Sequence, residues 1–486
     1  MLTSGPRSPP SGALRPSVVP VTRAHLRDVC AAVAATLLVV AAVLVGRHIQ
    51  HTSHTLFVGW PPLFASWNPH LGPGTPAAVA VAVAVVAYGP ALAARLPWRA
   101  LLAAAWGTAL AWAWSLALVD GWHRGVATRL TTRNEYLQVI DRFHDIPAAL
   151  GDFTHHILLD SPGHWPAHIA GHPPAATLTF VLLDRVGLGG GGWAGAWCIT
   201  VGATTCVAIL ITVRALADED LARRAAPFLV TAPAAVWMAT SADAYFAAVA
   251  AWSVALLALA VTGRVGARAG AFAFGAGLLS GLTCYLSYGL TLIALIAGAV
   301  LVLVRVRRRD LAQLPPFLLA GFAVVPLLFT LAGFSWWEAY RLLVERYYQG
   351  AGGIRPYGYW VWANLACTVL ITGLATVAGL RHACATLALV RHDAVTPGRQ
   401  GAVIRRPDPP GRPVAERRLT LLVSTALLAL LIADLSGMSK AETERIWLPF
   451  AMWLLTACAF LARPRPWLTA QTALALLLNH LLLTGW

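Results

Sequence analysis

The chain alternates between long apolar stretches and short polar segments rich in arginine. A helix needs about 20 predominantly apolar residues to cross a bilayer, with a range of roughly 17 to 25. By that measure the sequence predicts thirteen membrane-spanning helices, at 29–46, 77–94, 99–119, 193–213, 225–240, 243–262, 269–287, 288–304, 314–333, 358–380, 419–435, 446–462 and 467–485.

Composition agrees with this pattern, since 58% of the 486 residues are hydrophobic and only 12% are charged. Such an apolar surface far exceeds what one soluble core could bury. We therefore expect an all-α polytopic membrane protein with about thirteen transmembrane helices and a large extracytoplasmic loop that carries interfacial helices. The seven cysteines include no C-x-x-C pair, so neither a disulfide framework nor a cysteine-based metal site is indicated.

The formal charge of +15 would suit a nucleic-acid partner, but Lys440 is the single lysine and most arginines fall in short loops between apolar runs. That distribution indicates membrane topology, because basic residues collect on the cytoplasmic side. If the N-terminus is cytoplasmic, most of the basic residues lie on the cytoplasmic side of the membrane. We therefore expect a multi-pass protein of the plasma membrane. No nucleic-acid partner is expected.

This topology divides the chain into six parts. They are a disordered cytoplasmic N-terminus (1–24), three transmembrane helices (25–119), an extracytoplasmic catalytic loop with a re-entrant helix (120–192), a transmembrane core (193–390), a basic cytoplasmic loop (391–418) and the C-terminal transmembrane helices (419–486).

The outer loop, 120–192, is too long for a simple connection, and loops of this length are usually functional or disordered. Two amphipathic stretches, 133–145 and 145–160, argue against disorder, and Asp145 is suited to cap the second. A third helix is expected at 174–187. At about 14 residues it is too short to cross, and Pro173 and Pro174 suit its first turn. His172 would stand at the mouth of this re-entrant helix.

Three motifs follow one another along the chain: "NEYLQVIDRF", "GHPPAATLTF" and "TSADAYFAA". Their order resembles the GT-C class of polyprenyl-phosphate-sugar glycosyltransferases, which includes protein mannosyltransferases. Members typically carry an acidic pair early in the first large outer loop, a His-Pro-Pro turn after it, and an acidic residue at the outer end of a later span. Here Glu135 matches the second acid of the pair, His172 the turn and Asp243 the later acid. The first acid is replaced by Asn134.

A further outer segment, "SGMSKAETERIWLPF", is similar to one found in actinobacterial envelope glycosyltransferases. It places Glu444 and Arg445 at a membrane edge, where ionisable groups are costly unless paired, hydrated or functional. A guanidinium there could hold a lipid-linked phosphate with its forked donors. A Glu-Arg pair on an ordinary loop is the alternative.

The resemblance implies transfer of a sugar from a polyprenyl-phosphate donor to a hydroxyl of a glycan or protein acceptor in cell-envelope assembly. Glu135 is the first candidate for the base, Asp141 the second, and Asp120 a third catalytic candidate. A carboxylate shielded by the amphipathic helices would have its pKa raised toward the working range. His172 with Arg445 or Arg346 would meet the phosphate. No cofactor is firmly implied; a divalent cation is the one candidate, because the class includes members with and without one.

The histidines of the outer loop are otherwise interpreted as hydrated side chains. His164, His168 and His172 recur every four residues, but Pro166 and Pro173 interrupt any helix that would align them as metal ligands. Two other functions stay open for the whole chain: a multi-spanning transporter and a non-catalytic lipid-binding membrane protein. Few charges lie in mid-span and no internal repeat is found, which favours the enzyme over the transporter.

Overall fold

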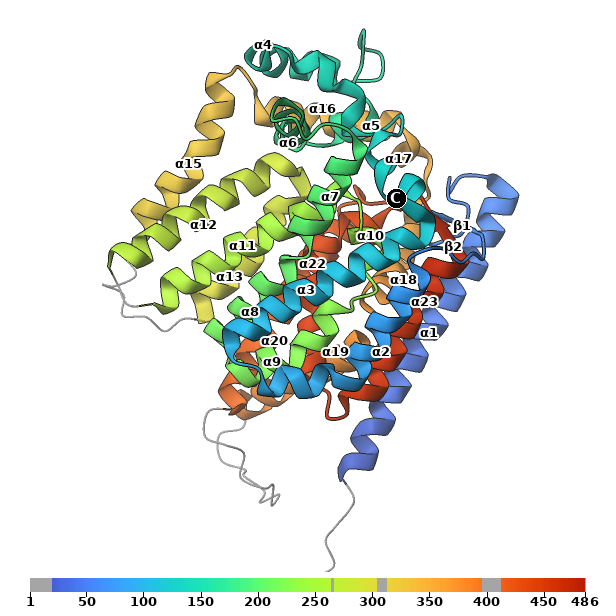
Figure 1. The fold of residues 1–486 in the computed structure, drawn as a ribbon, viewed down its shortest axis with the longest axis vertical. Coiled ribbons are helices and arrows are strands. Elements are labelled where there is room, and N and C mark those ends of the chain that lie inside the picture. Colours follow the sequence, from blue (N-terminus) through green and yellow to red (C-terminus); the bar gives the residue numbers. More distant parts are fainter. Residues whose placement is uncertain (1–19, 264–265, 304–312, 396–411, 486) are drawn as a thin grey trace, which may run out of the picture.

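A computed structural model describes residues 20–263, 266–303, 313–395 and 412–485, and these form an almost entirely helical protein (Figure 1). The longer helices make a bundle. They are α1 (Pro20–Ser53), α2 (Thr75–Arg95), α3 (Trp98–Ala117), α7 (Gly191–Gly202), α8 (Thr205–Leu216), α9 (Glu219–Val230), α11 (Ala242–Thr262), α12 (Ala267–Leu286), α13 (Ile293–Leu303), α15 (Pro315–Leu331), α18 (Tyr357–Thr372), α19 (Leu374–Val395), α20 (Arg412–Leu435) and α23 (Pro464–Leu481).

Among the described residues, seven helical segments are long and apolar enough to cross a membrane, or up to nine if each of two bent pairs counts as one span. The seven begin at α1, α2, α3, α7, α11, α12 and α20, with α7 and α8 together making one. These segments indicate a membrane protein. The expectation of thirteen spans is too high by this measure.

The excess arises where apolar sequence does not form one straight helix. The predicted span 314–333 ends at Gly333, whose φ of 88° turns the chain by 76° into α16 (Trp336–Gln349). Gly373, with φ 84°, separates α18 from α19 at an angle of 109°. Glycine adopts this left-handed backbone without the steric cost that other residues carry. Windows of apolar residues cannot detect such turns.

Other predicted spans are divided or shortened. The span 225–240 is divided between α9 and the four-residue helix α10 (Ala235–Met238), with Pro233 in the gap. The spans 288–304 and 446–462 correspond to shorter apolar helices. These consist of η6 (Tyr288–Leu292) with α13, and of α21 (Thr443–Ile446), α22 (Leu448–Leu454) and η7 (Leu455–Phe460).

Helix α11 occupies the centre of the bundle, packed against α7, α8, α12, α13 and α22. Sixteen of its 21 residues are buried, as its apolar sequence without a polar face requires. Its first turn begins at Ser241, whose hydroxyl accepts a hydrogen bond from the Asp243 amide at 3.2 Å. An acidic residue in this first turn is favoured by the helix dipole, so the local sequence accounts for a carboxylate at this end of α11, the most buried of the candidate membrane spans.

Short helices gather at one end of the bundle, at the top of Figure 1; we call residues 120–190 the cap. Next to the cap lie α16 and α17 (Ala351–Ile354). The cap contains η1 (Leu118–Asp120), the π-helical turn η2 (His123–Ala127), η3 (Arg129–Thr131), η4 (Tyr136–Phe143), α4 (Ile146–Gly151), η5 (Phe153–His156), α5 (Ala167–Gly171) and α6 (Ala175–Arg185).

The cap agrees with the sequence in part. The helix expected at 174–187 is α6, with Pro174 at its N-cap, and Asp145 caps α4 by accepting a hydrogen bond from the Ala148 amide at 3.1 Å. The amphipathic stretch 133–145 is the 3₁₀ helix η4 instead of an α-helix. The second amphipathic stretch, 145–160, forms two short helices, α4 and η5, instead of one.

A small antiparallel sheet joins distant parts of the chain. Strand β1 (Ala65–Trp67) pairs with β2 (Leu482–Thr484) in the register Ala65 to Thr484 and Trp67 to Leu482. It lies beside α23 near the cap end of the bundle (Figure 1). The expected N-terminal segment 1–24 and basic loop 391–418 lie for the most part outside the described residues.

Candidate active site

Glu135 lies at the start of η4, where its extended backbone (φ −97°, ψ 165°) points the side chain into the protein. Only 4% of the residue is exposed. The neighbouring Tyr136 anchors this turn, with its ring 5.3 Å from that of Phe180 on α6. The backbone carbonyl of Asn134 accepts a hydrogen bond from the His168 amide at 3.1 Å, which holds α5 beside η4.

His168, on α5, is buried and bridges two charged side chains. Its Nδ1 atom lies 2.9 Å from Oε1 of Glu135, and its Nε2 atom lies 3.2 Å from Nη2 of Arg445. The imidazole thus connects the cap to α21, 277 residues further along the chain.

Arg445 completes the network by contacting the end of the central helix. Its Nη1 atom donates to Oδ2 of Asp243 at 2.6 Å, and both side chains are almost fully buried. Ser241 donates to the same carboxylate oxygen at 3.1 Å. The acid, imidazole, guanidinium and second acid therefore form one continuous chain, Glu135–His168–Arg445–Asp243, which we call the buried network.

The backbone that presents Arg445 is strained. Ala441 and Glu442 adopt positive φ angles of 72° and 62°, a region that residues with side chains rarely occupy. Glu442 is held there by Arg355, whose Nη2 lies 3.2 Å from Oε1 of the carboxylate, and the other carboxylate oxygen lies 3.6 Å from Arg445. Backbone strain of this kind costs of order 1–3 kcal/mol for each residue and concentrates at functional sites.

The electrostatics of Glu135 differ from the sequence expectation. Burial by itself raises the pKa of this carboxyl, but the neighbouring His168 and the guanidinium of Arg445 together outweigh burial, and the pKa is lowered. The expected rise of this pKa toward neutrality is therefore wrong, because no local pattern reveals that His168 and Arg445 lie near this carboxyl. Glu135 is an ionised carboxylate at neutral pH, and its Oε2 atom is buried with no hydrogen-bond partner among the described residues.

His172 lies beside the buried network and is held by a different set of contacts. Its Nδ1 atom is 2.8 Å from the carbonyl oxygen of His168 and 3.1 Å from the Tyr136 hydroxyl. Since the carbonyl can only accept, Nδ1 carries the hydrogen. Burial lowers the pKa of His172 to about 4, so the ring is neutral at pH 7. The other ring nitrogen, Nε2, then has a lone pair and no hydrogen, so it can accept a hydrogen bond from a sugar hydroxyl but has no hydrogen to donate to a phosphate.

Glu444 and Arg346 are both near this end of the protein but outside the buried network. Glu444 is fully buried and accepts a hydrogen bond from the Phe64 amide at 2.8 Å, and burial raises the pKa of this carboxyl to about 7. Arg346, on α16, donates to the carbonyl of Trp165 at 3.2 Å. Its Nη1 atom is buried without a partner among the described residues.

The other two acidic candidates lie elsewhere. Asp141 is exposed on η4, with no ion pair or side-chain hydrogen bond within the described part of the chain. Asp120 belongs to a separate cluster, the Asp120 cluster, formed with His70 at 2.9 Å and with Arg129 at 2.5 Å. The structure therefore brings together Glu135, His172, Asp243 and Arg445, and does not join Asp141 or Asp120 to them.

His168 is the residue that sequence reasoning missed. The expectation that it is a hydrated loop histidine is wrong: its side chain is 9% exposed, whereas His155 and His164 are exposed as expected. A signal was available in its spacing of four residues from His172, which places both rings around Tyr136 at 6.1 and 5.9 Å. The partner Arg445 is too distant in sequence for any local pattern to reveal the pair.

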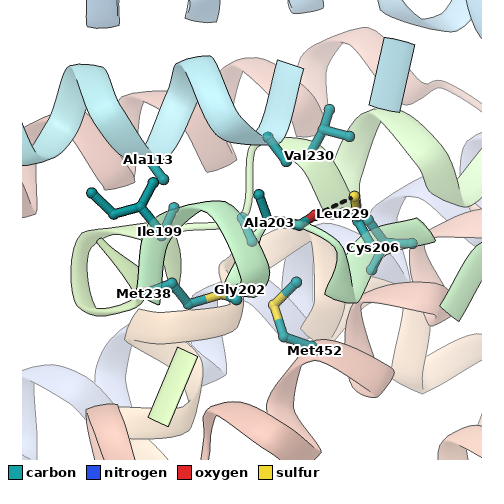
Figure 2. Close-up of a pocket in the computed structure, with 12 residues that line it drawn as sticks. Ala113, Ile199, Gly202, Ala203, Cys206, Leu229, Val230, Met238 and Met452 are labelled. Carbon is teal, nitrogen blue, oxygen red and sulfur yellow. Dashed lines mark hydrogen bonds between the residues drawn. The ribbon is translucent and has the colours of Figure 1, made fainter. Parts of the chain in front are cut away.

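A cavity inside the bundle offers no alternative site. It lies between α3, α7, α8 and α10 and holds about 20 Å³, lined by apolar side chains that include Ala113, Ile199 and Met452 (Figure 2). A space of that size holds at most one water, which would need polar partners. The residues that the structure describes contain no group of three or more His, Cys, Asp or Glu side chains placed to hold a metal ion.

Fold and site together define a helical membrane protein with a buried acid–imidazole–guanidinium network at the cap end. No protein-family model matches the chain, and no curated protein matches it either. Among solved structures, it is similar to the oligosaccharyltransferase of Archaeoglobus fulgidus in three forms. With zinc and sulfate the TM-score is 0.42 at 15% identity; in the apo form it is 0.42 at 13%. For AglB of the same organism, in complex with an inhibitory peptide and a dolichol-phosphate, it is 0.43 at 12%.

The matched regions cover 69%, 79% and 74% of this chain in the same order. They cover 45%, 50% and 49% of those proteins, so the chain spans about half their length. At these scores the likeness is a partial one between helical arrangements. The functional argument therefore depends on the site.

Proposed function

We propose that the protein is a membrane glycosyltransferase of the GT-C class, which transfers a sugar from a polyprenyl-phosphate donor to a hydroxyl of a glycan or protein. The cap would face the outside of the cell, with the N-terminus in the cytoplasm of an actinobacterium, and the product would belong to the cell envelope. The observation that carries the proposal is the buried network. In it His168 connects Glu135 to Arg445, and Arg445 binds Asp243, so three residues named from separate segments of the sequence come together.

The chemistry of such a transfer needs two kinds of group. A base must take the proton of the acceptor hydroxyl, and a cation must stabilise the negative charge that develops on the departing phosphate. Glu135 with His168 supplies an ionised carboxylate and an imidazole for the first task. Arg445 supplies a guanidinium with forked donors for the second.

The remaining residues have supporting roles in this proposal. Asp243 would hold Arg445 in place, because it already binds Nη1 at 2.6 Å. His172, neutral and with its hydrogen on Nδ1, would accept a hydrogen bond from a sugar hydroxyl at Nε2. Arg346 would offer at the edge of the site its Nη1 donor, which has no partner among the described residues. Asp141 and Asp120 have no part in it. A divalent cation is not required by these groups.

Burial also supports a transferase over a transporter or a passive lipid-binding protein. A charged network hidden from water is costly unless it is fully paired or does chemistry, and Oε2 of Glu135 is an unpartnered buried carboxylate oxygen among the described residues. A passive scaffold has no need of such a group. The cavity between α3, α7, α8 and α10 is too small and too apolar to hold a transported polar substrate.

The experiment that tests the proposal is analysis of glycans and lipid-linked sugars in a strain that lacks the protein. We expect one polyprenyl-phosphate sugar to accumulate and one envelope glycan to lose a sugar. Complementation with wild-type protein should reverse both changes, whereas complementation with Glu135→Gln at equal protein level should reverse neither. Unchanged glycans and donor lipids in the strain that lacks the protein would contradict the proposal.

A further inference from the structure

The contacts of His168 fix which of its ring nitrogens carries a hydrogen. Arg445 has only donors, so the 3.2 Å contact between its Nη2 and the imidazole Nε2 requires Nε2 to accept with its lone pair. The hydrogen therefore resides on Nδ1, the atom that lies 2.9 Å from Oε1 of Glu135. In this state His168 is a neutral imidazole, backed by a carboxylate, and its basic atom is covered by an arginine.

We propose that Nε2 of His168 is the atom that takes the proton from the acceptor hydroxyl, and that the donor phosphate uncovers it by drawing Nη2 of Arg445 away. This inference rests on the function proposed above and assigns the base within that site. Glu135 is then a positioning residue, which holds the tautomer and stabilises the imidazolium that forms.

The geometry favours this atom over the carboxylate. The acceptor oxygen must approach the sugar carbon that is bonded to the phosphate, and the phosphate is expected at Arg445. Nε2 lies 3.2 Å from Nη2 of that arginine, while Glu135 contacts the opposite side of the imidazole ring through Nδ1. A hydroxyl placed beside the phosphate therefore meets Nε2 before it can meet the carboxylate.

Arg445 can serve both states because its two terminal nitrogens have different partners. Nη1 is anchored to Oδ2 of Asp243 at 2.6 Å, whereas Nη2 holds His168 and lies 3.6 Å from Glu442. A phosphate that takes over Nη2 leaves the Asp243 anchor intact. The base is thus exposed only when donor is bound, which gives an ordered reaction with donor first. Because all these groups are buried, donor binding must also part α5 from α21.

The step balances as follows. The acceptor oxygen forms a bond to the anomeric carbon while the bond from that carbon to the phosphate oxygen breaks, and the phosphate leaves with the electron pair as a polyprenyl monophosphate. The hydroxyl proton moves to Nε2 of His168. The extra negative charge on the phosphate is stabilised by Arg445, and the imidazolium later returns its proton to water or to the departing phosphate.

The test compares two variants of His168 in full-length protein purified in lipid nanodiscs, with transfer measured as release of polyprenyl phosphate. His168→Asn keeps an amide N–H that can donate to Glu135 but has no basic nitrogen, and His168→Gly leaves space for added imidazole. We expect both to lose about 100-fold or more of the transfer rate, as removal of a general base does. Imidazole should restore at least about tenfold to His168→Gly and nothing to His168→Asn. His164→Ala, an exposed histidine of the same loop, should transfer at the wild-type rate.

Transfer by His168→Asn within about threefold of wild type would overturn the inference, because a structural donor would then suffice. Loss without rescue in a folded His168→Gly protein would overturn it as well. If wild-type protein itself transfers no sugar, the proposed function is wrong, which is a separate outcome. If the variants do not fold, a structure of wild-type protein with bound polyprenyl phosphate tests the same inference. We expect Nη2 of Arg445 to contact the phosphate and to have moved away from Nε2 of His168. An unchanged contact between Nη2 and Nε2 would overturn the inference.

Discussion

Two clusters of an acid, an imidazole and a guanidinium lie in or beside the cap, and they differ in how completely the acid is satisfied. In the Asp120 cluster both carboxylate oxygens are used, one by His70 and the other by Arg129. Arg129 also donates to the carbonyl of Thr484 at 3.0 Å, so the cluster fastens the cap to strand β2. In the buried network, Oε2 of Glu135 has no partner within the described residues.

The two clusters show that residue types alone do not distinguish a stabilising ion-pair cluster from a catalytic site. Both clusters contain the same three chemical groups at similar distances. A satisfied carboxylate that joins two chain segments stabilises the fold, whereas a buried carboxylate with an unused oxygen carries a cost that function can explain. We therefore expect changes in the Asp120 cluster to affect stability and changes in the buried network to affect transfer.

The largest effect is expected from Glu135→Gln. This change keeps the size of the side chain but removes the negative charge that orients and supports His168. We expect transfer to fall by about 10²–10⁴-fold, the range for loss of acid–base catalysis. Release of polyprenyl phosphate by purified protein measures it. The matched control is Asp141→Asn, an exposed acid on the same short helix, which should retain wild-type activity. Equal losses of transfer activity in Glu135→Gln and Asp141→Asn would contradict a specific role for Glu135.

Arginine-to-lysine changes at Arg445 and Arg129 test whether only the guanidinium of the buried network binds the donor phosphate. Lysine cannot reproduce the forked donors of Arg445, which contact Asp243 and His168 through different nitrogens. We expect Arg445→Lys to raise KM for the donor by about tenfold or more, since one good charge-assisted hydrogen bond to phosphate is worth about 1.5–3 kcal/mol. Arg129→Lys should leave KM unchanged. A similar KM in both variants would argue against phosphate binding at Arg445.

The pH dependence of the unfolding temperature tests the burial of Glu444, which lies beside the buried network. Its carboxyl has a pKa of about 7 in the folded protein because of burial, compared with about 4.3 in an unfolded chain. The raised value means that the protonated form is favoured by folding, so this contribution is complete below pH 4 and is lost as the pH rises through 7. We expect the unfolding temperature in detergent to fall between pH 5 and pH 8, and Glu444→Gln to flatten this trend. An unchanged slope in the variant would show that Glu444 does not titrate in this range.

The smallest effect on transfer is expected from Asp120→Asn. Weakening the contacts to His70 and Arg129 should reduce the free energy of unfolding by about 1–3 kcal/mol, as removal of one partner of a largely buried ion pair does. Transfer per molecule of folded protein should stay within about twofold of wild type. Thermal unfolding and transfer assays on the same preparation check both parts. A large loss of transfer with normal stability would place Asp120 in the reaction after all.

The sequence predicted those parts of the fold that local patterns determine. The first three long helices, α6 after Pro174 and the Asp145 cap of α4 all follow from short-range signals. The count of spans was too high because Gly333 and Gly373 bend two apolar segments and because three other predicted spans, 225–240, 288–304 and 446–462, are divided or shortened. The apolar content of a sequence window does not indicate where the chain changes direction.

For the site, the order of three motifs led to Glu135, His172 and Asp243, and the separate segment 436–450 led to Arg445; the structure brings these four residues together. The role of His168 could not be predicted, because its burial results from Arg445 arriving across 277 positions of sequence. His168 and, to a lesser extent, Arg445 lower the pKa of Glu135, although burial alone would raise it. Contacts between segments so distant along the chain are set by packing of the whole bundle, and no local spacing records them.

The most direct test of the central claim is a transfer assay with purified wild-type protein, a polyprenyl-phosphate sugar carrying a labelled sugar, and extracted envelope glycan as the acceptor. The account predicts that label moves to the glycan and that an equal amount of polyprenyl phosphate is released, with both signals lost in Glu135→Gln. Folded wild-type protein that moves no label from any polyprenyl-phosphate sugar, or Glu135→Gln protein that moves it at the wild-type rate, would contradict the account.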